Sequence, residues 1–271
     1  MPFRTKLEQA AEQLQWLKRR AHRRFTQLWA VTDGGYAKRP VLRAARQEGI
    51  VVVGRLARNA SLWSLPAPKP QGQRGPQATY GRQRLSLAKR AGHPQSWHQV
   101  RCVQYRHEVV KTVKTFLATW RPAGGMIRVV VVQEEDGWRA YFCTNPEATV
   151  EEILEAAADR GAIEETFKDV KEVWGAGQQQ VRNLYANVGC FNLNSWMYSL
   201  VEAWAWEQPE EELVDRQTSP WDDRFRRASH ADKRKALQRQ VLREEIQAVL
   251  AGQPTKEEIR NLAERLLQLA T

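Results

Sequence analysis

Apolar residues recur every three to four positions in several parts of the chain, which is the spacing of one face of an α-helix. Near the N-terminus, Leu7, Leu14 and Leu17 follow this spacing. Thr149 and Glu152 have the spacing of a capping box, so we expect another helix to begin there. The predicted helices cover residues 4–24, 40–47, 149 to about 174, 231–250 and 256–270.

Short apolar runs between turn residues predict strands elsewhere. The run LWAV is soon followed by Asp33 and a glycine pair, and IVVVGRL covers Ile50–Leu56. With the predicted helix between them, these strands form a βαβ unit and should be parallel. Further strands are predicted at 99–105 and on both sides of Asp136-Gly137, a pair typical of hairpin turns. Residues 65–83 are rich in Pro, Gly and Gln, which predicts a loop or an extended arm.

Two acidic residues occupy positions where chemistry is expected. Asp33 follows the first predicted strand, and open α/β sheets bind ligands beyond the carboxyl ends of their strands. A plain Asp-Gly turn is the alternative interpretation. On the predicted helix at 149–174, Glu164 lies with Arg160 and Lys171 at the edge of an apolar stripe. Ordinary surface pairing of Arg160 with Glu164, four residues apart, would also explain that arrangement.

The positive charge is concentrated in one segment. The 271 residues carry a net charge of +11, and residues 38–90 contain twelve Lys and Arg against one acid, so this segment holds the whole surplus. Such a segment predicts a polyanionic partner, most simply nucleic acid. A solvated basic surface without a partner is the alternative.

Composition favours a globular protein of a reducing cytoplasm. A hydrophobic content of 42% with 11 Trp is sufficient for a core. The three cysteines have no metal-ligand spacing, and the N-terminus is too polar for a secretory signal. Residues 184–206 are long enough to span a membrane. Three Asn and Glu202 would be costly in hydrocarbon, so we predict a helix buried in the protein core instead.

Four sequence features occur together between residues 1 and 206. They are Asp33 in AVTDGGYAKRP, the predicted β-rich segment, the R-x3-E-x6-K spacing of Arg160, Glu164 and Lys171, and the following QVRN and ANVGCFNLN-x-WMYSLVEAWAW. Together they resemble the DDE transposases of bacterial insertion sequences. In particular they resemble the group marked by a Tyr-Arg-Glu-Lys signature.

The resemblance implies an α/β fold with an RNase H-like core, here partial, a β-strand insertion and C-terminal helices. Residues 1–56 would form the first part of the core and 57–148 the insertion with its basic loop. Residues 149–210 would hold the Glu164 helix and the buried helix after it, and 211–271 a C-terminal helical region. The implied function is DNA transposition by metal-dependent strand cleavage and transfer, with Mg²⁺ or Mn²⁺ as cofactor.

The family's functional residues can be carried over position by position. Asp33 matches the second catalytic acid and Glu164 the third, and both are expected to bind the metal. Arg160 and Lys171 match the basic members of the signature and are expected to contact DNA phosphate, whereas Ala157 stands where the signature has Tyr. The basic segment supplies four further expected DNA contacts, Arg82, Arg84, Lys89 and Arg90.

The family's first Asp has no counterpart, because residues 1–32 contain no Asp. The chain therefore resembles the C-terminal part of a transposase and is expected to be inactive in transposition by itself. A non-catalytic DNA-binding or regulatory remnant is the alternative function, and a basic RNA-binding protein is a third. The expected partner is double-stranded DNA at transposon ends and target, bound by a homodimer in the bacterial cytoplasm and nucleoid.

Overall fold

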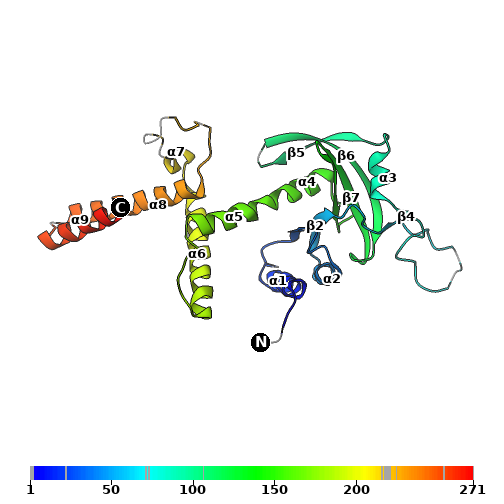
Figure 1. Cartoon of the computed structure of the whole chain (residues 1–271), viewed down its shortest axis with the longest axis horizontal. Coiled ribbons are helices and arrows are strands. Elements are labelled where there is room, and N and C mark those ends of the chain that lie inside the picture. The colour runs from blue at the N-terminus through cyan, green and yellow to red at the C-terminus, as the bar shows by residue number, and fades with distance from the viewer. Residues whose placement is uncertain are drawn as a thin grey trace. The chain divides into compact units, whose positions relative to one another are not determined.

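The chain forms two compact units, Met1–Ala162 and Ile163–Thr271. The computed structural model describes residues 3–270, apart from residues 22, 71, 73, 106, 215, 217–220, 224 and 253. Figure 1 shows that the sheet belongs to the first unit and that the second is helical.

The first unit is built on one mixed sheet of eight described strands. Their order is β1-β2-β8-β7-β6-β3-β4, and β5 pairs with β6 outside this path. The strands are β1 (Trp29–Thr32), β2 (Val51–Leu56), β3 (Leu62–Trp63), β4 (Arg84–Leu85), β5 (His98–Gln104), β6 (His107–Trp120), β7 (Gly125–Glu134) and β8 (Gly137–Cys143). The helices of this unit are α1 (Lys6–Ala21), α2 (Arg39–Gln47), α3 (Leu87–Gly92) and α4 (Val150–Asp159).

The predicted βαβ unit is confirmed as β1-α2-β2. Strands β1 and β2 are parallel, with Trp29 opposite Val51 and Thr32 opposite Gly54. The other edge of β2 pairs with β8 in antiparallel register. Neighbouring side chains of β2 are buried on opposite faces of the sheet, which explains why its apolar run does not alternate with polar residues.

The β7–β8 hairpin at Asp136-Gly137 is also confirmed, with Glu134 opposite Gly137 and the glycine at a φ of 125°. The 14-residue strand β6 was not predicted. Its pattern is broken by Lys114, an inward-facing lysine with 5% of its surface exposed. The ammonium group donates hydrogen bonds to the carbonyl oxygens of Arg90, at 2.8 Å, and His93, at 2.7 Å. A charged residue thus occupies a core position because backbone acceptors satisfy it.

Each face of the sheet is covered by helices. On one face, Leu42 of α2 and Leu87 of α3 pack with Phe142 of β8 in a single buried cluster. On the other face, Ile153 and Leu154 of α4 pack against the strands. Figure 1 shows α2 and α4 on opposite sides of the sheet. Both faces of the sheet are therefore core, as in a three-layer α/β fold.

The second unit consists of five described helices. The first of them is the end of the helix predicted over 149–174, which is interrupted. That predicted helix is divided at Arg160 into α4 and α5 (Gly161–Glu172). The capping box predicted at its start is confirmed, because Thr149 and Glu152 exchange side-chain and backbone hydrogen bonds. The remaining helices are α6 (Leu184–Ala205), α7 (Glu210–Leu213), α8 (His230–Ala251) and α9 (Lys256–Ala270).

The predicted helix over residues 184–206 is present, but the prediction that it is buried is wrong. The helix α6 is present, but only Val201 and Ala205 are buried, while Leu184 and Trp196 are at least 70% exposed. Apolar residues occur all around this helix, so packing on one side, against α8, leaves the others uncovered. In the described part of the chain, neither α6 nor any other helix is apolar enough over a sufficient length to cross a membrane.

A buried histidine links the helices of the second unit. The Nε2 atom of His230 accepts a hydrogen bond from the Trp174 indole N–H at 2.7 Å, and its Nδ1 lies 2.7 Å from the Glu202 carboxylate. Because indole can only donate, Nδ1 carries the proton and donates it to Glu202. Lys233 also donates to Glu202, at 2.6 Å, and the Tyr198 ring stacks on the imidazole at 4.2 Å.

This network predicts a pH-dependent contribution to stability. The hydrogen bond from His230 lowers the pKa of Glu202 below its ordinary value of 4.5, and Lys233 adds to the effect. Stabilisation by the carboxylate is therefore complete above pH 4.5 and is lost as the pH falls through the lower folded-state pKa. We expect Glu202→Gln to lower the free energy of unfolding by about 1–3 kcal/mol at pH 7, since bonds to a charged acceptor are lost.

The measurement is urea unfolding of the wild type and Glu202→Gln at several pH values between 7 and 3. The difference between them should shrink below pH 4.5, whereas the exposed control Glu207→Gln should match the wild type throughout. A difference that is constant with pH would contradict this role of the Glu202 carboxylate.

Candidate active site and nucleic-acid interface

Asp33 lies at the carboxyl end of β1, in the turn that leads to α2. Its Oδ1 atom accepts hydrogen bonds from the backbone N–H groups of Gly35, at 2.7 Å, and Tyr36, at 3.2 Å. A Cβ atom at position 35 would lie 2.9 Å from that oxygen, so a side chain there would displace the Asp33 carboxylate from this position. The side chain is exposed, and in the described part of the chain its Oδ2 atom accepts no hydrogen bond. One carboxylate oxygen is fixed and the other is available.

The strand end beside Asp33 is tightly packed. Gly54 lies opposite Thr32 in the parallel pair. A Cβ atom at Gly54 would come within 2.9 Å of the Thr32 hydroxyl and 3.0 Å of the Phe142 ring. Because Gly54 has no side chain, β1, β2 and the ring of Phe142 can pack closely together next to the turn of Asp33.

Glu164 and the basic residues of its signature lie along α5 and at the end of α4 that precedes it. Glu164 is exposed in the first turn of α5, and Lys171 is exposed in its last turn, where the helix dipole favours each charge. Arg160 is the exposed C-terminal cap of α4. Ala157, at the signature Tyr position, packs against the core beneath the sheet.

The two predicted catalytic acids belong to different compact units, Asp33 to the first and Glu164 to the second. Among the described residues, no three His, Cys, Asp or Glu side chains are grouped as the ligands of one metal ion would be. The predicted metal ligands are therefore two exposed carboxylates, each fixed by its own secondary structure.

The four DNA contacts predicted from the basic segment lie close together in sequence around β4 and α3. Arg82, Arg84 and Lys89 are exposed, and Arg84 donates a hydrogen bond to the Ser61 hydroxyl at 3.3 Å. Arg90 is half-buried, with its guanidinium 4.2 Å from the centre of the Phe116 ring. Three of these four cations are therefore exposed on the surface, where a polyanion can reach them.

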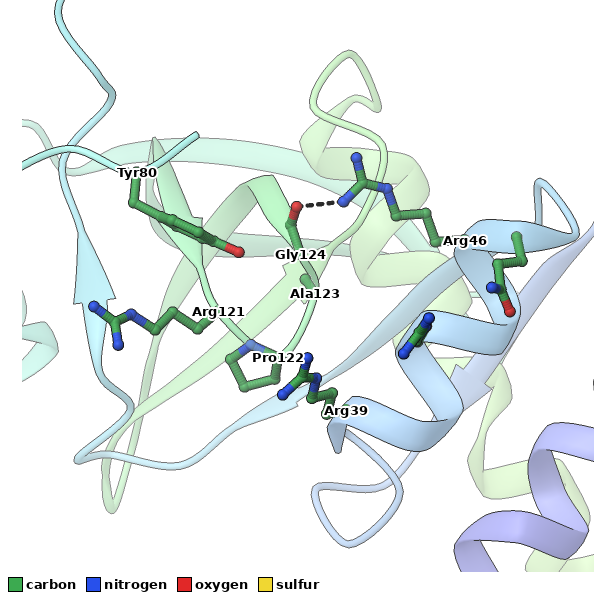
Figure 2. A pocket seen from close by; sticks show the side chains of 9 residues that line it. Arg39, Arg46, Tyr80, Arg121, Pro122, Ala123 and Gly124 are labelled. Carbon is green, nitrogen blue, oxygen red and sulfur yellow. Dashed lines mark hydrogen bonds between the residues drawn. The ribbon is translucent and has the colours of Figure 1, made fainter. Parts of the chain in front are cut away.

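A larger basic feature was not singled out from the sequence. Four arginines line a cavity of about 850 Å³ between α2 and the turn that joins β6 to β7. We call it the arginine pocket, and its basic residues are Arg39, Arg43, Arg46 and Arg121. Figure 2 shows Arg39 and Arg46 extending from α2, with Arg121 and Tyr80 on the other side. The spacing of the three α2 residues, at i, i+4 and i+7, was a sequence signal for one helical face.

Comparison with known proteins identifies the family. Residues 4–200 match the family model described as the transposase DDE domain, a range that contains Asp33, Glu164 and the arginine pocket. No curated protein matches the chain. The mixed sheet with helices on both faces agrees with the RNase H-like fold of this family. Because the match covers most of its length, the chain belongs to the family of transposases with a DDE domain.

Proposed function

We propose that this transposase takes part in a metal-dependent reaction that cuts and transfers DNA strands, in which Asp33 and Glu164 are catalytic metal ligands. Residues 1–32 contain no counterpart of the family's first Asp, so we expect this chain to carry the reaction incompletely by itself. The observation that carries the proposal is the family match over residues 4–200, which includes both acids. A non-catalytic protein that binds DNA through the same surface is the second candidate. The exposed cations of β4 and α3 support DNA binding in either case.

The environment of Asp33 suits Mg²⁺ or Mn²⁺. Both ions prefer oxygen ligands, and Mg²⁺ demands a nearly ideal geometry from them. The two backbone N–H groups that hold Oδ1 orient the carboxylate, and Oδ2 remains as a donor atom. When bound, such ions activate the attacking oxygen and stabilise the leaving one in phosphoryl transfer. The role of Asp33 in this proposal is to present a carboxylate oxygen in a fixed direction.

The basic residues near Glu164 have a separate role. Arg160 and Lys171 are exposed cations on the helices that flank and carry Glu164. Guanidinium and ammonium groups bind phosphate oxygens through charge-assisted hydrogen bonds. We therefore assign them to DNA phosphates close to the reacting strand. Arg82, Arg84, Lys89 and Arg90 would hold the duplex farther along its length.

Metal-directed backbone cleavage tests the assignment of Asp33 without requiring turnover. Fe²⁺ replaces Mg²⁺, and ascorbate with peroxide then generates radicals that cut the polypeptide near the bound ion. We expect a cut next to Asp33 in the wild type that excess Mg²⁺ suppresses. Asp33→Asn should lose it, because an amide is a much weaker ligand than a carboxylate.

The control is Asp136→Asn, which makes the same change at the exposed Asp-Gly turn of the β7–β8 hairpin. The asparagine at position 33 keeps an oxygen that can accept both backbone hydrogen bonds, so the turn should be preserved. Cleavage at Asp33 that persists in Asp33→Asn would rule out this residue as a metal ligand.

A further inference from the structure

The arginine pocket has an excess of cations with no acid to balance them. Its remaining polar lining comes from Gln47 and Tyr80, and no Asp or Glu contributes. In the described part of the chain, none of the four guanidinium groups forms a salt bridge. Four cations gathered without counter-charges repel one another and attract an anion strongly.

The α2 side of the pocket is a straight row of cations. Arg39, Arg43 and Arg46 are exposed, whereas the opposite side of the helix buries Val41, Leu42, Ala44 and Ala45 in the core. The first and the last arginine are seven positions apart, which is about 10 Å along a helix. Measured along the axis of a B-DNA duplex, that length corresponds to the rise of about three phosphates of one strand.

The other side of the pocket is fixed to α2 by a backbone contact. The Arg46 guanidinium donates a hydrogen bond to the carbonyl oxygen of Gly124, drawn as a dashed line in Figure 2. Gly124 has a φ of 74°, and a Cβ atom there would lie 2.6 Å from the Arg46 Nη1 atom. The positive φ favours glycine, and a side chain at this position would push the Arg46 guanidinium aside. The contact holds the turn that carries Arg121. Arg46 positions the site. Arg39 and Arg43 are exposed, and the Arg121 guanidinium lies 5.5 Å from the centre of the Trp63 ring, a contact that leaves its N–H groups able to bind a phosphate.

The direction of α2 relates the pocket to Asp33. In the β1-α2-β2 unit the chain leaves β1 at Asp33, enters α2 at Arg39 and returns toward the start of β2. The Arg39 end of the row therefore lies near the carboxyl ends of β1 and β2. The Arg46 end lies near the amino ends of these strands. A strand bound along the row would extend toward the turn of Asp33.

We propose that the arginine pocket binds two or three consecutive phosphates of one DNA strand and guides that strand toward Asp33. This inference rests on the proposed function, since it takes DNA as the substrate. The pocket is too large for a single phosphate, and guanidinium groups match phosphate oxygens in bidentate geometry. The contacts are to the backbone, so they are independent of base sequence.

Binding of a fluorescent 20-bp duplex, measured by anisotropy between 50 and 200 mM NaCl, tests the proposal. One variant combines Arg39→Ala, Arg43→Ala and Arg121→Ala, and leaves the positioning residue Arg46 in place. The control combines Arg23→Ala, Arg24→Ala and Arg101→Ala, three exposed arginines outside the pocket, and removes the same charge.

We expect the pocket variant to bind more weakly, and the slope of log affinity against log salt to decrease by about 3, close to one unit for each phosphate that the variant no longer binds. The control should change the slope much less. Equal slopes and affinities in the two variants would overturn the proposal, because the effect would then follow total charge alone.

Chemical modification locates the binding site in the unaltered protein. Phenylglyoxal reacts with accessible arginines, and mass spectrometry of peptides measures the extent at each position. Bound duplex should protect Arg39, Arg43 and Arg121 but leave Arg101 reactive. Sodium tripolyphosphate at the same phosphate concentration should protect them far less. Equal protection by tripolyphosphate would assign the pocket to a small polyphosphate and overturn a DNA-strand site.

These results separate the pocket from the proposed function. If the wild type binds duplex while the pocket arginines stay reactive, only the pocket is ruled out. If the wild type binds no DNA at all, both proposals fail. Loss of the metal assignment of Asp33 in the Fe²⁺ experiment, with the pocket still protected, would remove the catalytic proposal and leave a DNA-binding site.

Discussion

Because the family's first Asp has no counterpart in residues 1–32, we expect the chain to nick DNA only slowly, and replacing Glu164 with Gln should lower that metal-dependent rate by about 100-fold or more. The amide has the same shape as the carboxylate but no negative charge, so the variant should bind less tightly the divalent ion whose positive charge would stabilise the reacting phosphate. Glu164 is exposed in the first turn of α5, and the substitution should therefore leave the helix folded.

The assay follows conversion of supercoiled plasmid to open circles, with protein in excess of DNA so that slow single turnovers are counted. Mg²⁺ and Mn²⁺ are compared, and EDTA defines the background. Glu165→Gln is the matched control, an exposed carboxylate in the next position of the same helix. Equal nicking by Glu164→Gln and Glu165→Gln would refute a catalytic role. Absence of metal-dependent nicking in the wild type would favour the non-catalytic DNA-binding candidate.

Phe142→Ala should lower the free energy of unfolding by about 3–5 kcal/mol. The side chain is fully buried in β8, between β2 and β7, and its ring meets Trp120 edge-on with centroids 5.0 Å apart. Removing the ring deletes buried apolar surface and leaves a cavity that neighbouring strands cannot close. The cavity would lie beside Gly54 and the end of β1, so the turn of Asp33 should lose support as well.

Thermal and urea unfolding followed by circular dichroism would measure the effect. Phe25→Ala removes the same group from a side chain that is 57% exposed and should change stability by less than about 0.5 kcal/mol. Similar destabilisation by the two variants would contradict the central position of Phe142 in the core.

Local sequence signals predicted much of this fold. The Asp136-Gly137 turn and the capping box of Thr149 and Glu152 depend on residues a few positions apart, and both are present. Strand β6 was not predicted because Lys114 occupies an inward position. The two backbone acceptors of this lysine belong to Arg90 and His93, which are distant in the sequence. Burial of α6 was predicted from composition, but composition does not say which sides of a helix find a partner.

The candidate site was predictable where it depends on a single element. The position of Asp33 after a strand and of Glu164 on a helix follows from neighbouring residues. The arginine pocket is formed by segments that are distant in the sequence. The turn that carries Arg121 lies beside α2 because of the order of the strands in the sheet, which local sequence signals do not give. The net charge of the basic segment indicated a polyanion, but Arg121 lies outside that segment.

The hydrogen bond between Arg46 and Gly124 also constrains how this sequence can diverge. A side chain at position 124 would need both a left-handed backbone and the space now taken by the guanidinium, so a mutation there displaces Arg46. Once displaced, an arginine at position 46 no longer holds the turn, and selection to keep it weakens. Positions 46 and 124 should therefore covary among descendants of this protein, with the glycine and the arginine disappearing as a pair.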